Sequence, residues 1–224
     1  MENEYQKRAE EIVKEHQYTL LAQDNGCEIW RCGKPGTNCY AFNIAVMPMG
    51  IAVCGDIGEL TFNVYGRDIE FLAGRDIEYY IHSKLSPECR TTEYDEDHIK
   101  EEVAERVIEH LLGDEWIDGY IEEDLLDKIQ EDVKEFKFEE LKTYIHDLYM
   151  KTDTTEDYHT YMDDLNTFLT EVDELGHSQE AYTLLDECEV VEFAEAYEYG
   201  FDKPSSSLLQ SLYIINEAAK GILE

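Results

Sequence analysis

The first third of the chain places apolar residues in two successive patterns, one helical and one with a period of two. Residues 4–22 favour an amphipathic helix, and Asp24-Asn25-Gly26 then marks a turn. Beyond the turn, large apolar residues occupy every second position, which is typical of strands with one buried face. Four strands are predicted, at 29–32, 40–46, 51–54 and 60–64.

The connections between these strands, at 34–38, 48–50 and 55–58, are too short to hold crossover helices. An antiparallel meander is therefore predicted, with Gly55-Asp56-Ile57-Gly58 as a tight hairpin turn rather than a phosphate loop. Its apolar face would need a cover. That face comprises Tyr40, Phe42, Ile44, Val46, Ile51, Val53, Leu60, Phe62 and Val64.

From residue 67 onward the apolar residues return to a helical period. Two short helices are predicted at 69–73 and 77–85, and longer apolar stripes follow in steps of about four residues. Gly113 followed by Asp114 fits the end of one helix and the cap of the next. The stripes lie within 99–111, 117–133, 138–148, 158–172, 184–194 and 205–219.

These patterns together predict an α+β protein. A small antiparallel meander of about four strands, packed with helices, would occupy residues 1–90, and an all-helical region would occupy 91–224. No linker rich in glycine or proline separates them, so the second region is expected to pack on the first. We find no fixed-period repeat, and the sequence therefore does not support a solenoid.

Charge divides the chain at the same place. The net charge is −35, of which residues 1–90 contribute −5 and residues 91–224 contribute −30. Adaptation to a saline solvent would acidify the strand region as well, so the asymmetry favours a surface built for binding. Such a surface repels nucleic acid and anionic membranes, and the predicted partner is a basic protein or a cation.

Neither a signal peptide nor a long apolar span is apparent, so we expect a soluble cytoplasmic protein. The cysteines are interpreted as reduced and buried, because most lie in strand-like apolar runs. The six are Cys27, Cys32, Cys39, Cys54, Cys89 and Cys188.

The acidic helices supply the candidate binding residues. Carboxylates four residues apart lie about 6 Å apart along a helix axis, a spacing of the same order as that of successive phosphates on one nucleic-acid strand. The alternative is the solvated outer face of an ordinary helix. The predicted partner-binding residues are Glu101, Glu102, Glu105, Glu109, Glu122, Glu123, Asp124, Asp127, Asp163 and Asp164.

Metal binding and catalysis have weaker support. The cysteines lack the paired spacing of structural zinc sites, and the acid clusters at 94–98 and 153–157 lack the glycine and closing glutamate of an EF-hand. Seven scattered histidines accompany no nucleophile motif. We predict no cofactor and no dedicated metal site, and keep an enzyme with a spatially assembled Cys–His pair as an alternative.

One segment, residues 28–90, resembles a family of uncharacterised bacteriophage and prophage proteins. The residues that carry the resemblance are Trp30 to Gly36, Tyr40 to Ile44, Gly50 to Val53, Gly55 to Gly58, and Tyr79-Tyr80. The resemblance implies a phage origin and no particular activity. The acidic remainder is similar in character to phage proteins that block host restriction or CRISPR nucleases.

The sequence therefore predicts a phage-encoded inhibitor whose acidic helices mimic nucleic acid and occupy a basic, nucleic-acid-binding nuclease of the host. The alternative is a non-enzymatic structural or regulatory phage protein that uses its helices for assembly with partners or with a second copy.

Overall fold

The computed structural model describes residues 3–113, 138–151, 156–193 and 196–224. The chain forms two compact units. Unit 1 comprises Met1–Glu93 together with Pro204–Glu224, and unit 2 comprises Tyr94–Lys203. Unit 2 is thus inserted into the chain of unit 1.

Unit 1 is built on a five-stranded antiparallel sheet whose strands follow one another in sequence order. This confirms the predicted meander, and the Gly55-to-Gly58 hairpin turn closes its last strand pair. The strands are β1 (Gln17–Asp24), β2 (Cys27–Gly33), β3 (Phe42–Met47), β4 (Gly50–Gly55) and β5 (Gly58–Phe62).

The helix predicted over residues 4–22 is wrong beyond its first half. Helix α1 spans Glu4–Val13, and β1 follows as a fifth strand. Asn25 and Gly26 have φ of 49° and 77°, the left-handed pair that closes a two-residue hairpin between twisted strands. A bulge at Leu21 shifts the register of β1, which breaks the period-two pattern and hides the strand in the sequence.

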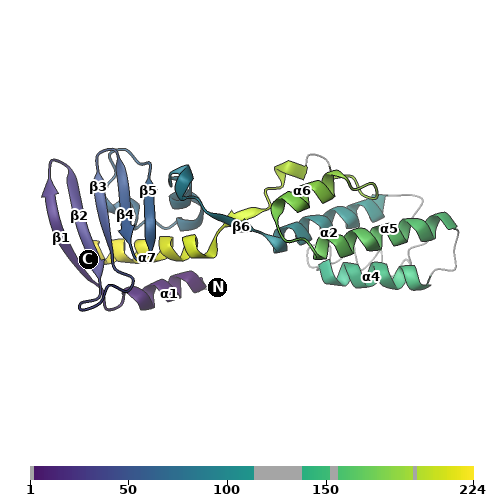
Figure 1. Ribbon diagram of the computed structural model, residues 1–224, viewed down its shortest axis with the longest axis horizontal. Helices are drawn as coiled ribbons and strands as arrows, with labels where there is room; N and C mark the ends of the chain where they lie inside the picture. The colour runs from purple at the N-terminus through teal and green to yellow at the C-terminus, as the bar shows by residue number, and fades with distance from the viewer. Residues whose placement is uncertain (1–2, 114–137, 152–155, 194–195) are drawn as a thin grey trace. The chain divides into compact units, whose positions relative to one another are not determined.

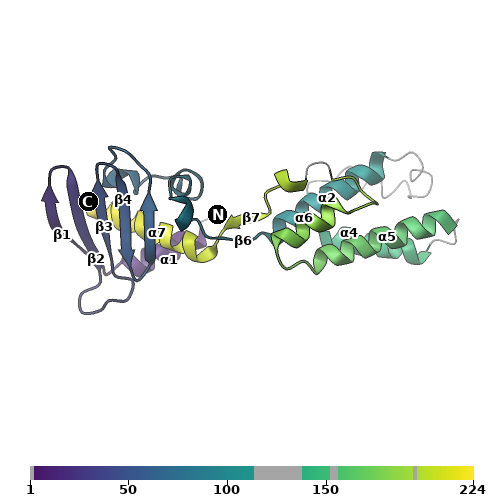
Figure 2. The ribbon, with the colours of Figure 1, turned by 45° about the horizontal axis from the view of Figure 1, so that its top comes forward.

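The cover of the sheet is helix α7 (Ser206–Leu223), which runs across one face beside α1 in Figures 1 and 2. Leu208, Leu212 and Ile215 of α7 are buried in one core with Phe42 and Ile44 of β3. The prediction that residues 91–224 form one helical region therefore fails for α7, since the apolar sheet face recruits the last helix of the chain.

Short turns connect the sheet to the rest of unit 1. The predicted helices at 69–73 and 77–85 are a 3₁₀ turn, η1 (Ile69–Phe71), and a π-helical turn, η2 (Ile77–Ile81), and another 3₁₀ turn, η3 (Pro87–Cys89), follows. Strands β6 (Thr92–Tyr94) and β7 (Asp202–Pro204) pair where the chain leaves and re-enters unit 1.

Unit 2 has a core of its own, to which the predicted stripes contribute. Ile99, Val103, Val107 and Leu111 are buried together with Leu141, Ile145, Leu165 and Val172. The stripe predicted within 117–133 lies outside the described residues. The elements of unit 2 are α2 (Glu96–Gly113), α4 (Phe138–Lys151), α5 (Glu156–Asp173), α6 (Ser178–Asp186) and the 3₁₀ turn η4 (Ala196–Glu198). The stripe predicted within 184–194 is wrong beyond Asp186, where helix α6 ends. Within the described ranges, no helix has the length and apolarity that a membrane crossing requires.

Candidate functional site

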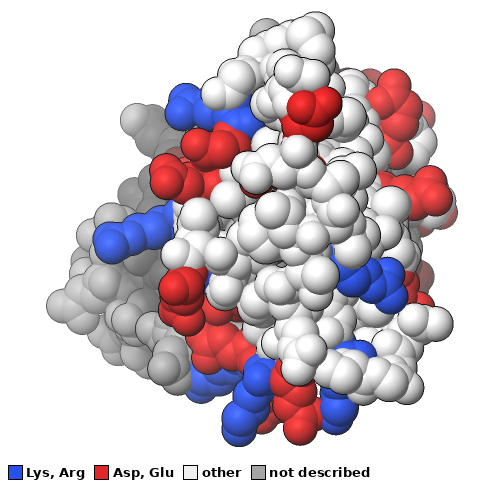
Figure 3. Space-filling model, turned by 90° about the vertical axis from the view of Figure 1, so that its left-hand side faces the viewer, with Lys and Arg blue, Asp and Glu red and all other residues white. Residues whose placement is uncertain are grey.

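Most of the net negative charge of the protein, −28 of −35, belongs to unit 2. Its residues include 8 Lys and Arg against 36 Asp and Glu, a balance of −28, whereas unit 1 has 10 against 17, a balance of −7. Figure 3 shows the end of unit 1 at β1, where uncharged residues cover the centre and charges of both signs lie around them. The candidate binding surface is therefore sought on unit 2.

Helix α2 carries a continuous line of acids, which we call the α2 stripe. Its members follow one another in steps of four residues, and all are exposed, while the opposite side of the helix is buried in the core of unit 2. Each step rises about 6 Å along the axis, so the stripe extends for about 18 Å. The α2 stripe consists of Asp97, Glu101, Glu105 and Glu109.

The structure thus brings together three of the predicted binding residues and adds Asp97, which the sequence analysis assigned only to an acid cluster. A count in steps of four back from Glu101 would have found it. Glu102 is half-buried beside the stripe. Asp163 and Asp164 are exposed on a different helix, α5, which packs against α4 and α6. Four further predicted residues, Glu122, Glu123, Asp124 and Asp127, lie outside the described residues.

An ion-pair cluster uses two of the scarce cations of unit 2 inside the helical array. Asp173 of α5 accepts from Lys100 of α2 at 2.7 Å and from Lys142 of α4 at 2.8 Å. The hydrogen bonds from Lys100 and then Lys142 hold the pKa of Asp173 below its ordinary value. Burial acts to lower the pKa of Lys100, but its hydrogen bonds to Asp173 and Glu96 raise it overall. This cluster links α2, α4 and α5, and its two lysines are not available to pair with acids of the surface.

Two further cations of unit 2 are also paired. Arg106 binds Glu109 at 3.0 Å, and Lys203 binds Asp95 at 2.9 Å. Glu109 is therefore the one member of the α2 stripe with a cationic neighbour in the described part of the chain. The acids of the stripe that no described residue pairs with are Asp97, Glu101 and Glu105.

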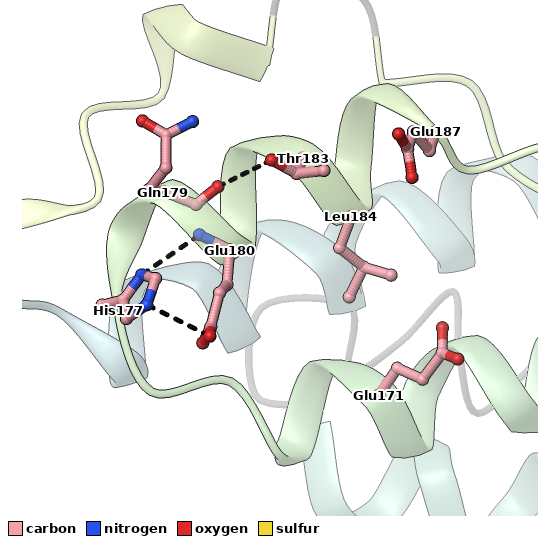
Figure 4. A pocket seen from close by; sticks show the side chains of 7 residues that line it. All are labelled: Glu171, His177, Gln179, Glu180, Thr183, Leu184 and Glu187. Carbon is pink, nitrogen blue, oxygen red and sulfur yellow. Dashed lines mark hydrogen bonds and ion pairs between the residues drawn. The ribbon is translucent and has the colours of Figure 1, made fainter.

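A second acidic feature is a hollow of about 420 Å³ between α5 and α6. Figure 4 shows Glu171 on α5 and Glu187 directly after α6, with Leu184 pointing from α6 toward α5. His177 caps α6: its Nδ1 accepts from the Glu180 amide at 3.3 Å, and its Nε2 donates to the Glu180 carboxylate at 3.1 Å. Glu180 keeps its negative charge, but its carboxylate is engaged with His177, so Glu171 and Glu187 supply the other two carboxylates of the hollow.

Carboxylates beside an apolar side chain suit a cation that carries an alkyl stem. A lysine or arginine side chain has both parts, because its methylene groups pack against apolar surface while its charged end stays polar. The chemistry of the hollow therefore suits one basic side chain of a partner.

The cysteines differ from their predicted burial. Cys32 is buried, but Cys39 and Cys54 are exposed. Cys54 pairs across the sheet with Asn43 and so points away from the core face that Val53 occupies. Burial raises the pKa of the Cys32 thiol to about 12, which leaves almost no thiolate at neutral pH and does not favour a nucleophile there.

Within the described ranges, no group of three or more His, Cys, Asp or Glu side chains is placed to hold a metal ion. Comparisons of the chain with models of protein families, with curated proteins and with solved structures gave no match.

Proposed function

We propose that unit 2 is a binding unit for a basic protein surface, with the α2 stripe as its main contact. The observation that supports this proposal is the charge of the stripe: among the described residues, three exposed carboxylates in a row have no ion-pair partner, and the paired cations of unit 2 bind other acids. Repulsion between like charges four residues apart destabilises a helix slightly. A row of this kind is therefore costly to the fold and suited to a partner that neutralises it.

The chemistry of the stripe matches a partner that ordinarily binds nucleic acid. A rigid helix holds the carboxylates at regular intervals of the same order as the phosphate spacing, so lysines and arginines placed for phosphates can engage them. The net charge of −28 on unit 2 would speed the encounter with a positive surface and make it sensitive to salt. The α5–α6 hollow would receive one basic side chain of the same partner.

A more specific proposal, inhibition of a host defence nuclease of the restriction or CRISPR type, combines this chemistry with the resemblance of residues 28–90 to phage proteins. It predicts that the partner's own DNA or RNA competes with unit 2 for the same groove.

The test is affinity purification from a bacterial lysate, at low and high salt, with three forms of the full chain. One is the wild type and one is the stripe variant D97N/E101Q/E105Q/E109Q. The control variant, E4Q/E11Q/E59Q/E88Q, removes the same charge from exposed acids of unit 1. We expect a basic nucleic-acid-binding protein to be enriched at low salt by the wild type and the control, and lost with the stripe variant.

Added double-stranded DNA should release that protein from the wild-type chain. Capture that is equal for the stripe variant, or that persists unchanged at high salt, would contradict the proposal.

A further inference from the structure

Unit 1 contains a short tandem repeat. Residues 66–71 read Gly-Arg-Asp-Ile-Glu-Phe, and residues 74–79 read Gly-Arg-Asp-Ile-Glu-Tyr, eight positions later. The two copies are identical at five positions and aromatic at the sixth. The prediction that the chain contains no fixed-period repeat considered longer units and missed this one.

The aspartate of each copy caps a short turn, which is the 3₁₀ turn η1 in the first copy and the π-helical turn η2 in the second. Asp68 caps η1 by accepting from the amide of Glu70 at 3.2 Å, and Asp76 caps η2 by accepting from the amide of Tyr79 at 3.3 Å. Ile69 and Ile77 are buried in the core of unit 1. The aspartate and the isoleucine of each copy therefore serve the fold. Neither the cap nor the buried isoleucine requires the arginine that precedes them.

A hollow of about 500 Å³ lies between the two copies. Arg67 and Arg75 line it from equivalent positions of the repeat, and the rings of Phe71 and Tyr80 line it as well. These rings meet edge to face at 6.0 Å, and Phe71 packs in turn on Phe62. The aromatic wall is thus held in place by the core, and the volume is that of a site for a small organic molecule.

Both arginines are free to bind a ligand. Among the described residues, neither Arg67 nor Arg75 takes part in an ion pair or a hydrogen bond. The chain has 18 Lys and Arg against 53 Asp and Glu, so two unpaired guanidinium groups at one hollow are unexpected on composition alone. Asp68 and Asp76 also line it, and each carboxylate accepts a backbone N–H in its cap while keeping its negative charge.

We propose that this hollow binds a small organic molecule that carries a phosphate or carboxylate group and a planar ring. The guanidinium groups of Arg67 and Arg75 would donate to the oxyanion, for which their forked geometry is well suited. The ring would lie against Phe71 and Tyr80. Glu70, which lines the same hollow and has no partner in the described part, would accept an N–H of the ligand.

The experiment titrates the full chain with three probes and measures binding by calorimetry. Pyrophosphate offers an oxyanion without a ring, adenosine monophosphate offers a phosphate with a ring, and benzoate offers a carboxylate with a ring. Saturable binding of adenosine monophosphate or pyrophosphate assigns a phosphate ligand, and binding of benzoate alone assigns a carboxylate ligand.

Variants locate the site. R67Q and R75Q should each weaken binding roughly 10- to 100-fold, the loss of one charge-assisted contact, and the double variant should abolish it. R8Q removes an equal charge from an exposed arginine of α1 and should bind like the wild type. Y80L should weaken the two ring-bearing probes and spare pyrophosphate, whereas E70Q should strengthen pyrophosphate binding by removing a repulsive charge.

Unchanged melting temperatures of the arginine variants would confirm that they fold, as expected for side chains without partners. The proposal is overturned if none of the probes saturates the wild type at millimolar concentrations, or if R67Q/R75Q binds as tightly as R8Q.

Discussion

Units 1 and 2 are of nearly equal length and each buries its own apolar core, yet their net charges are −7 and −28. Acidity that served the solubility of the whole protein, or its adaptation to salt, would be spread over both units. The difference instead follows the division of the fold. Acidity is a property of the inserted unit, and that unit is where the proposed basic partner would bind.

The charge of helix α7 agrees with its place in unit 1 and not with its place in the sequence. The helix lies at the end of the acidic part of the sequence, but it carries one acid, Glu217, and one base, Lys220. Its apolar side chains cover the sheet of unit 1. Charge therefore changes along the chain where the fold changes, at β6 and β7, and not where a division at residue 90 would place it.

The largest expected effect comes from removing α7. A chain that ends at residue 204 would expose the buried face of the sheet, and we expect unit 1 to unfold because its core loses Leu208, Leu212 and Ile215. Unit 2 should stay folded. Hydrogen exchange measured by mass spectrometry would show loss of protection in β3 and β4 and retained protection in α5.

The isolated fragment 94–203 provides the control, since it has a complete core of its own. A fragment that unfolds, or a truncated chain that loses protection in both units, would show that the two units do not fold separately.

Substitution of Asn216 should destabilise unit 1 as well, but by less than the removal of α7. Asn216 is buried in α7 and donates through Nδ2 to the carbonyl oxygens of Leu72 and Gly74, at 2.6 and 2.8 Å. Asn216→Leu would leave these two carbonyls without a donor, and we expect unit 1 to lose about 1–3 kcal/mol of unfolding free energy. Urea unfolding would measure it, with the exposed Ser207→Ala as control. An equal loss in unit 2 would argue against separate units.

Much of the fold follows from local pattern. Alternation in 40–46 and 51–54 predicts β3 and β4, and the four-residue steps from Ile99 to Leu111 predict α2, because each pattern reports which face of the element is buried. The position of α7 could not be predicted in this way. Its apolar stripe could pack in the core of either unit. Which core it joins depends on the sheet face of unit 1 that the other elements leave uncovered, and that is not a local property of the sequence.

The candidate sites also differ in whether a local sequence pattern predicts them. Glu101, Glu105 and Glu109 could be placed in one line from helical spacing alone, because spacing within a helix is local. The α5–α6 hollow is lined by Glu171 and Glu187, which are far apart in the sequence, so no local pattern predicts it. The arginine pair of the tandem repeat lies between these cases: the repeat is visible in the sequence, while the hollow between its copies depends on how η1 and η2 pack.

An effect of about 1–2 kcal/mol on unit 2 is expected from Asp173→Asn. The substitution removes the negative charge that pairs with Lys100 and Lys142 and leaves one acceptor oxygen. The three side chains retain 17–32% exposure, so the loss is smaller than the ~3–5 kcal/mol of a fully buried pair. The pKa of Asp173 is lowered in the folded state. Its contribution is therefore present above the unfolded value near 3.9 and lost as pH falls through the folded pKa.

The difference between wild type and D173N should accordingly be largest at neutral pH and should shrink to nothing in acid, as followed by urea unfolding of unit 2. D163N, an exposed acid of α5, is the matched control and should have little effect at any pH. A penalty for D173N that is independent of pH would mean that packing, not charge, fastens these helices.

The smallest effect has the opposite sign. E101Q/E105Q removes all three like-charged i,i+4 pairs of the α2 stripe, at 97/101, 101/105 and 105/109, and we expect unit 2 to gain about 0.2–0.5 kcal/mol for each pair. The gain should fade in about 0.5 M salt, because screening weakens the same repulsion in the wild type. E59Q, in the nearly balanced unit 1, should give no comparable gain. A loss of stability in E101Q/E105Q would show that these acids support the fold, whereas a gain together with lost partner capture would mean that unit 2 keeps them for binding.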